Sequence, residues 1–259
     1  MSIERLLAIM ARLRDPATGC PWDREQTWAT IAPHTIEEAY ELADAIRQDD
    51  AALVRDELGD VLFQVVFQSR IAEERGLFDF AAVADTISDK LERRHPHVFG
   101  EAQVSDVAEQ AEAWEAHKAA ERRQKGQGMG ALDGVTPGLP ALTRASKLGK
   151  RASRVGFDWP ELGGVLAKVE EEIAEMRQAA QAGAVDEVQE ELGDLLFSVV
   201  QAARHLGVDP ESALRDANAK FERRFRDMEA RLRAEGRAVT DATPEQLEAL
   251  WALAKRDLG

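Results

Sequence analysis

The sequence is poor in cysteine and in long apolar runs. Its 259 residues include one cysteine, Cys20, so the chain cannot form an internal disulfide and suits a reducing compartment. No apolar run approaches the roughly 20 residues that a membrane-spanning helix needs. Residues 1–13 carry charged side chains, which a signal peptide would not show along its apolar segment. We therefore expect a cytoplasmic protein with no membrane partner.

Basic residues are also fewer than acidic ones. Lysine and arginine number 33 against 48 aspartates and glutamates, a net charge of −15. This balance argues against nucleic acid as the main partner. A polyanionic substrate would need metal cations or a local group of basic residues to be held. With 44% hydrophobic and 31% charged residues, the composition is that of a soluble globular protein.

Signals for β-strands are nearly absent, whereas helical periodicity covers most of the chain. We expect an all-α fold, with helices that include residues 35–46, 51–75, 105–124, 166–180 and 185–206. Thr35 is expected to open the first of these helices, with Glu38 at the capping-box position. Asp79, Asp209 and Thr243 are expected to be N-cap residues.

A segment rich in glycine and proline divides the chain. Residues 126–140 contain five glycines and two prolines, a composition typical of a linker. The predicted domains are residues 1–125 and 143–259, joined by a linker over 126–142.

The two halves repeat one pattern of acidic residues. D-E-L-G-D-V-L-F-Q-V-V at 56–66 returns as E-E-L-G-D-L-L-F-S-V-V at 190–200. Each half has an E-x-x-E pair followed by an E-x-x-D pair, and 57 − 41 and 191 − 175 are both 16. The strings K-x-E-R-R and W-x-x-x-K also recur, the latter at Trp114/Lys118 and Trp251/Lys255. The period exceeds 120 residues, which indicates two tandem helical bundles rather than a solenoid.

The spacing of the acids predicts a metal site. Residues three apart share a helical face, so four carboxylates would converge beside the apolar stripe that includes Leu192, Leu196 and Val199, at the edge of the core. Their mutual repulsion calls for a cation, and oxygen ligands without cysteine or histidine favour Mg²⁺ or Mn²⁺ over zinc. The alternative is a solvated acidic face. The duplication favours the metal site, as do Gly59 and Gly193, which would allow a partner helix or a ligand to approach closely.

Basic and aromatic residues could complete a nucleotide site. Lys220 and Arg224 lie four residues apart on one helical face and could bind phosphate oxygens. Trp251 precedes Lys255 by one turn, and an indole can stack on any nucleobase. Burial of Trp251 in a core is an equally good interpretation of that residue.

Seven short motifs stand out: G-C-P-W-D at 19–23, E-E-A-Y-E at 37–41, E-L-G-D at 57–60, R-R-H-P-H-V-F-G at 93–100, R-V-G-F-D-W at 154–159, E-E-I-A-E at 171–175 and E-L-G-D-L-L-F at 191–197. Together they resemble the MazG family of nucleoside triphosphate pyrophosphohydrolases. The resemblance implies an all-α dimer that uses Mg²⁺ to hydrolyse nucleoside triphosphates to monophosphate and pyrophosphate, with broad base tolerance and the second repeat as the active one.

The family's motifs assign roles to individual residues. The implied metal ligands are Glu172, Glu175, Glu191 and Asp194. The implied nucleotide site is lined by Lys168, Glu171, Glu190, Lys220, Arg224, Trp251 and Lys255. The first repeat keeps its four acids as a second potential metal site, formed by Glu38, Glu41, Glu57 and Asp60. We expect the first repeat to be mainly structural and to support dimerisation.

Three functions are compatible with these features. In the first, a metal-activated water attacks the α-phosphate of a nucleoside triphosphate, with Glu171 or Glu172 orienting or deprotonating that water. In the second, the same site binds a nucleotide as a non-catalytic sensor. In the third, the chain is a helical interaction module whose acids are solvated surface. The repeated spacing favours the first two.

Overall fold

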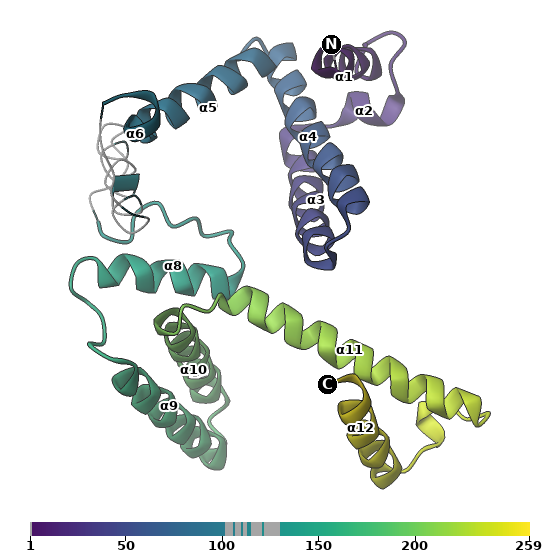
Figure 1. The fold of residues 1–259 in the computed structure, drawn as a ribbon, viewed down its shortest axis with the longest axis vertical. Coiled ribbons are helices and arrows are strands. Elements are labelled where there is room, and N and C mark those ends of the chain that lie inside the picture. The colour runs from purple at the N-terminus through teal and green to yellow at the C-terminus, as the bar shows by residue number, and fades with distance from the viewer. Residues whose placement is uncertain (1, 102–105, 107–109, 111–112, 115–120, 122–129) are drawn as a thin grey trace. The chain divides into compact units, whose positions relative to one another are not determined.

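The computed structural model describes residues 2–101, 106, 110, 113–114, 121 and 130–259, and in those residues it contains helices and no strand (Figure 1). The chain divides into two compact units, Met1–Lys118 and Ala119–Gly259. The predicted all-α fold is confirmed. The helix predicted over 105–124, together with Lys118, lies largely outside the described residues. The predicted domain boundary near 125 lies there too and stays a prediction.

The first unit is built on a helical hairpin. Its elements are α1 (Ser2–Leu13), α2 (Pro21–Glu25), α3 (Trp28–Gln48), α4 (Ala51–Glu74), α5 (Phe80–Arg94) and α6 (Pro96–Phe99). Helices α3 and α4 pack along each other, and α1 packs against α4 (Figure 1). Asp50 caps α4, because its carboxylate accepts a hydrogen bond of 2.9 Å from the Ala52 amide. The predicted cap at Asp79 is confirmed by a 2.8 Å bond from the Ala82 amide.

Helix α3 begins earlier than the sequence predicts. Thr27 and Thr30 form the capping box, in which the Thr30 hydroxyl oxygen accepts a 2.8 Å hydrogen bond from the Thr27 amide. Thr35 lies inside the helix, where its hydroxyl donates to the Ile31 carbonyl at 3.3 Å. The predicted Thr35–Glu38 capping box is therefore wrong. Pro33 lies inside the helix and obscures its true start in the sequence.

A small apolar core joins α1 to the hairpin. It contains Met10, Ile31, Val66, Phe67 and Ile71, all buried. Beside this core, the buried guanidinium of Arg14 forms a 2.7 Å ion pair with Glu74 and donates to the carbonyl of Asp23. Arg14 therefore ties the end of α1 to α2 and to the end of α4.

The second unit repeats the hairpin and extends it. Its elements are α8 (Ala141–Ser153), α9 (Leu162–Ala182), α10 (Val185–His205), α11 (Pro210–Ala234), η1 (Val239–Asp241) and α12 (Pro244–Leu258). Helices α9 and α10 form the hairpin, and α8 packs on α10. Helix α11 leads away from the hairpin, and α12 packs on α11 (Figure 1). The predicted caps at Asp209 and Thr243 are confirmed.

The contact between α8 and α10 is polar. Gln201 is 1% exposed and stands where the first unit has Phe67, since 201 − 67 equals the 134 residues that separate the acidic motifs. A Cβ added to Gly149 would lie 1.8 Å from Gln201 Oε1, so any larger residue there would displace the Gln201 amide. Gln201 Oε1 accepts a 2.9 Å hydrogen bond from Arg204, which in turn forms an ion pair with Asp158.

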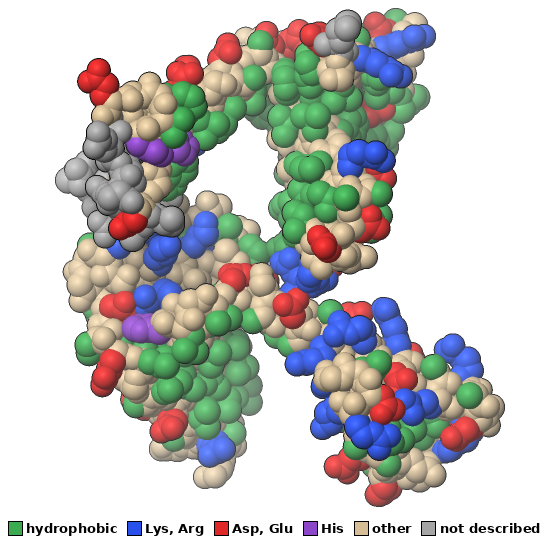
Figure 2. All heavy atoms as spheres, in the orientation of Figure 1, with side chains coloured by type: hydrophobic (Ala, Val, Ile, Leu, Met, Phe, Trp, Pro, Cys, Tyr) green, Lys and Arg blue, Asp and Glu red, His purple; other side chains and the backbone are tan. Residues whose placement is uncertain are grey.

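The apolar stripe beside the acids is not buried within its own unit. Leu192, Leu196 and Val199 on α10 are 44%, 50% and 46% exposed. Their equivalents on α4, which are Leu58, Leu62 and Val65, are 52%, 40% and 37% exposed. Figure 2 shows apolar side chains gathered over both hairpins. The expectation that the acids of α10 lie beside a stripe buried in the core is therefore wrong, because each hairpin turns a neighbouring face toward α1 or α8. No helix of the described residues could cross a membrane.

Asp158→Asn should destabilise the second unit in a pH-dependent way. Hydrogen bonds from Arg204 lower the pKa of Asp158 to about 2, below the roughly 3.9 of an unfolded aspartate. Its stabilisation is therefore present above pH 4 and is lost as the pH falls from about 4 through 2. We expect the substitution to cost about 2 kcal/mol at pH 7. Urea unfolding of both proteins at pH 7, 4 and 2.5 measures this, and a difference that does not shrink at low pH would contradict it.

Candidate metal and nucleotide site

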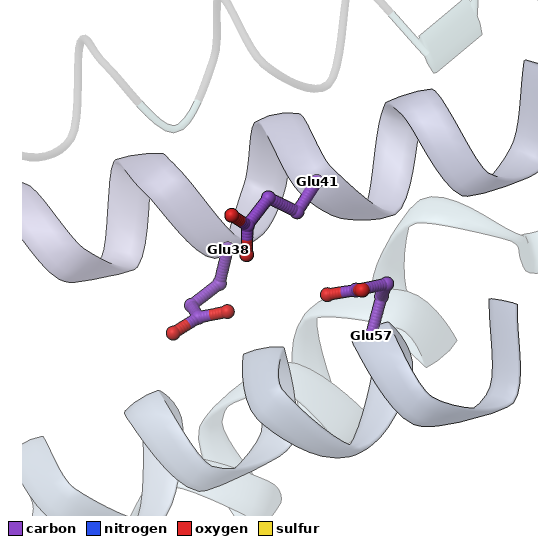
Figure 3. Close-up of side chains that lie close together, drawn as sticks. All are labelled: Glu38, Glu41 and Glu57. Atoms are coloured by element: carbon purple, nitrogen blue, oxygen red, sulfur yellow. The ribbon is translucent and has the colours of Figure 1, made fainter. Parts of the chain in front are cut away.

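Three carboxylates converge in each hairpin. Glu38 and Glu41 extend from α3 toward α4, which contributes Glu57 (Figure 3). Each offers one oxygen, and these oxygens all lie within 4.8 Å of one another. Glu172 and Glu175 on α9 and Glu191 on α10 form the same arrangement, also within 4.8 Å. The structure thus brings together three of the four predicted ligands in each repeat, because both hairpins keep the same spacing across their turn.

The fourth predicted ligand of each set lies at the margin of its cluster. Asp60 and Asp194 are exposed and are not among the three converging carboxylates. Each lies close enough to raise the pKa of a neighbouring glutamate. Burial and then the charge of Asp60 raise the pKa of Glu38. Burial and then the surrounding carboxylates, Asp194 included, raise the pKa of Glu191.

The electrostatics of both clusters fit a hard divalent cation. Burial and then the charge of Glu41 raise the pKa of Glu57 as well, so the repulsion is present in both repeats. Neither cluster contains histidine or cysteine. Oxygen donors of this kind are the ligands that Mg²⁺ and Mn²⁺ prefer.

A lysine contacts the buried acid of the second cluster. Lys168 Nζ lies 2.6 Å from Glu172 Oε1 and 2.8 Å from Glu171 Oε1. Glu172 is 3% exposed, whereas Glu171 is exposed. The hydrogen bonds to Glu171 and then to Glu172 raise the pKa of Lys168. Sequence reasoning placed Lys168 only at the nucleotide, although its i,i+4 spacing from Glu172 could have indicated this pair.

The predicted phosphate and base contacts lie on a separate arm, which consists of helices α11 and α12. Arg224 Cζ is 5.9 Å from the centre of the Trp251 ring, and Phe221 packs at 5.3 Å from that ring. Trp251 is half-buried, whereas Lys220 and Lys255 are exposed. The Nε of Arg224 is buried and has no hydrogen-bond partner among the described residues. Trp251 is therefore partly packed in the arm and partly open.

The arm does not meet the acid cluster of its own unit. Helix α12 packs on α11, and Figure 1 shows it apart from α9. Of the predicted nucleotide contacts, the structure places Lys168, Glu171 and Glu190 on the hairpin, where Glu190 is exposed and adjacent to Glu191.

The glycines inside the acidic motifs do not mark close helix packing in the single chain. A Cβ built at Gly59 or at Gly193 meets nothing within 4 Å. The predicted close approach of a partner helix is therefore absent in both hairpins.

The fold and the site define an all-α protein with two carboxylate clusters suited to a divalent cation. A model of the MazG nucleotide pyrophosphohydrolase domain matches residues 26–99 and 162–228, and each matched segment contains one cluster. The chain belongs to the MazG family.

Two relatives match over almost their whole length. A nucleoside triphosphate pyrophosphohydrolase of Escherichia coli (strain K12) is 53% identical over 256 residues, which cover 98% of this chain and 97% of the relative. The nucleoside triphosphate pyrophosphohydrolase/pyrophosphatase MazG of Thermotoga maritima is 44% identical, covering 97% and 95%. The resemblance to the MazG family is thereby confirmed.

Glu191→Gln should stabilise the protein when metal is absent. Because the pKa of Glu191 is raised in the folded state, its favourable contribution exists when it is protonated and is lost as the pH rises through that pKa. At pH 7.5 the amide removes this repulsion, so the metal-free Tm should rise by about 3 °C. The further rise on adding Mg²⁺ should shrink, because a ligand is gone. Glu187→Gln, an exposed change in the first turn of α10, is the control and should not raise the metal-free Tm. A lower metal-free Tm for Glu191→Gln would contradict the cluster's repulsion.

Proposed function

We propose that the chain is a Mg²⁺-dependent hydrolase that converts nucleoside triphosphates to monophosphates and pyrophosphate, with Mn²⁺ as a possible substitute metal. The observation that carries this proposal is the convergence of Glu172, Glu175 and Glu191 around a space lined by oxygen atoms. Membership of the MazG family and the printed names of both relatives support the same reaction.

Glu172, Glu175, Glu191 and Asp194 would hold the metal. The chemistry that Mg²⁺ supplies when bound is neutralisation of phosphate charge and a lowered pKa for a bound water. Glu171 is the better of the two candidates for the base, because it is exposed and lies outside the converging group, whereas Glu172 belongs to it. A base at that position would take the proton of a water that attacks the α-phosphorus.

Lysine and arginine side chains of the arm would stabilise the departing pyrophosphate. Lys220 and Arg224 can offset the charge that builds on the leaving oxygens, and the unpartnered Nε of Arg224 is a donor suited to a phosphate oxygen. Trp251 would stack on the base without distinguishing its edge, which accounts for broad base tolerance. Positioning and charge neutralisation thus account for most of the catalysis.

A second copy of the chain would complete this arrangement. The exposed stripes Leu58–Leu62–Val65 and Leu192–Leu196–Val199 are apolar surface that neither unit buries by itself. We propose that they pack in a homodimer. Because the arm and the acid cluster lie apart in one chain, we also propose that the arm of one copy serves the acid cluster of the other.

Product analysis tests the reaction. Each nucleoside triphosphate is incubated in ¹⁸O-labelled water with and without Mg²⁺, and the products are separated. We expect monophosphate and pyrophosphate only with metal, and the label in the monophosphate, because water attacks the α-phosphorus. Glu172→Gln and Asp194→Asn should each reduce kcat at least about a hundredfold. Label in pyrophosphate would place the attack at the β-phosphorus, and intact triphosphate would indicate a nucleotide sensor.

Leu196→Glu should separate assembly from metal binding. A charge in the centre of the stripe should convert the dimer to a monomer in sedimentation and abolish hydrolysis, because the arm of the second copy is lost. The rise in Tm on adding Mg²⁺ should remain, since the acid cluster lies within one chain. Leu132→Glu, an exposed apolar position outside the helices, is the control. An active Leu196→Glu monomer would refute the shared site.

A further inference from the structure

The residue four positions before the first glutamate of each acid cluster differs between the repeats. A shift of 134 residues relates the clusters, since 172 − 38 and 191 − 57 both equal 134. The same shift relates His34 to Lys168, because 168 − 34 is also 134. Each of the two lies four residues before the first glutamate of its cluster and therefore on the same helical face.

Lys168 directly contacts the buried glutamate of the second cluster. Its Nζ is 2.6 Å from Glu172 Oε1, and the side chain of Glu172 is only 4% exposed. A second contact of 2.8 Å to Glu171 holds the ammonium from the solvent side. Burial removes hydration from a carboxylate, and a charged partner in direct contact compensates for that loss. Lys168 is such a partner and belongs to the chain itself.

His34 makes a different contact. Its Nδ1 lies 3.4 Å from Glu37 Oε2, and both side chains are largely exposed, at 45% and 63%. In the described part of the first unit, no lysine, arginine or histidine forms an ion pair with Glu38. Imidazole lacks the long flexible stem with which lysine reaches a carboxylate one turn away. Among the described residues, Glu38 therefore has no counterpart of the Lys168 contact.

We propose that Lys168 is a positioning residue that holds Glu172 turned into the second cluster, and that His34 does not do this for Glu38 in the first cluster. The inference rests on the proposed hydrolysis and identifies what makes the two repeats unequal. A carboxylate held in place by a neighbouring cation favours turnover, whereas one without such a contact is free to leave the cluster under the repulsion of its neighbours. His34→Lys would therefore give the first repeat a positioning cation equivalent to Lys168.

Exchanging the two side chains tests this inference. In the full-length chain carrying Glu175→Gln, His34→Lys should raise kcat for nucleoside triphosphate hydrolysis with Mg²⁺ at least about tenfold. Adding Glu41→Gln should abolish the gain, because it removes a ligand of the first cluster. In the otherwise unchanged chain, Lys168→His should lower kcat about tenfold with a smaller change in KM. Lys168→Arg should retain most activity, since a guanidinium can pair with both carboxylates.

Thermal melting provides a readout that is independent of turnover. Lys168→His should lower the metal-free Tm by about 3 °C and enlarge the rise on adding Mg²⁺, because the metal then supplies the only counter-charge. Lys168→Arg should leave both values near those of the unchanged chain. Lys147→His makes the same chemical change at an exposed position of α8 and should alter neither.

Two results would overturn the inference. One is an unchanged rate on adding His34→Lys to the Glu175→Gln chain. The other is a Lys168→His protein that melts and turns over like the Lys147→His control. If the unchanged chain hydrolyses no nucleoside triphosphate, the proposed function fails instead, and the melting comparison still decides whether Lys168 holds Glu172 in place.

Discussion

The structure depends on holding mutually repelling carboxylates together at the turn end of a helical hairpin. Raised pKa values at Glu38, Glu57 and Glu191 record that repulsion in both repeats. Each case has burial as its first cause, because the acids lie where two helices approach. A protein gains nothing in stability from such a cluster. The proposed cation would account for its presence at the same spacing in both halves.

The helices outside each hairpin stabilise the end of the hairpin that lies away from the repelling carboxylates. In the first unit, α1 contributes Met10 to an apolar core, and Arg14 fastens the chain to Glu74. In the second unit, Gln201 and Arg204 form a polar network with Asp158 instead. The two repeats thus anchor the same hairpin by different chemistry. The two repeats can use different contacts here because these contacts lie away from the acids and need only hold the helices together.

The sequence alone could predict features that depend on local spacing. The caps at Asp79, Asp209 and Thr243, the tandem all-α plan and the convergence of three acids in each repeat follow from periods of three to four residues. Features that depend on distant contacts were missed. The start of α3 was hidden by Pro33, and the exposure of Leu58 and Leu196 depends on which face α1 or α8 covers. The spacing of residues in the sequence likewise does not indicate that the arm is separate from the acids.

The difference between the repeats follows from what offsets the charge of the buried acid. In the second repeat an ammonium on the same helix stands 2.6 Å from Glu172, so part of the charge of this acid is offset before any ligand binds. In the first repeat the equivalent side chain is bound to Glu37 on the surface. Duplication produced two equal sets of ligands, but equal ligands do not make equal sites. Both sets already converge, so a bound metal would meet the same ligands in each, but in the second set Lys168 stands beside the buried acid and offsets part of its charge.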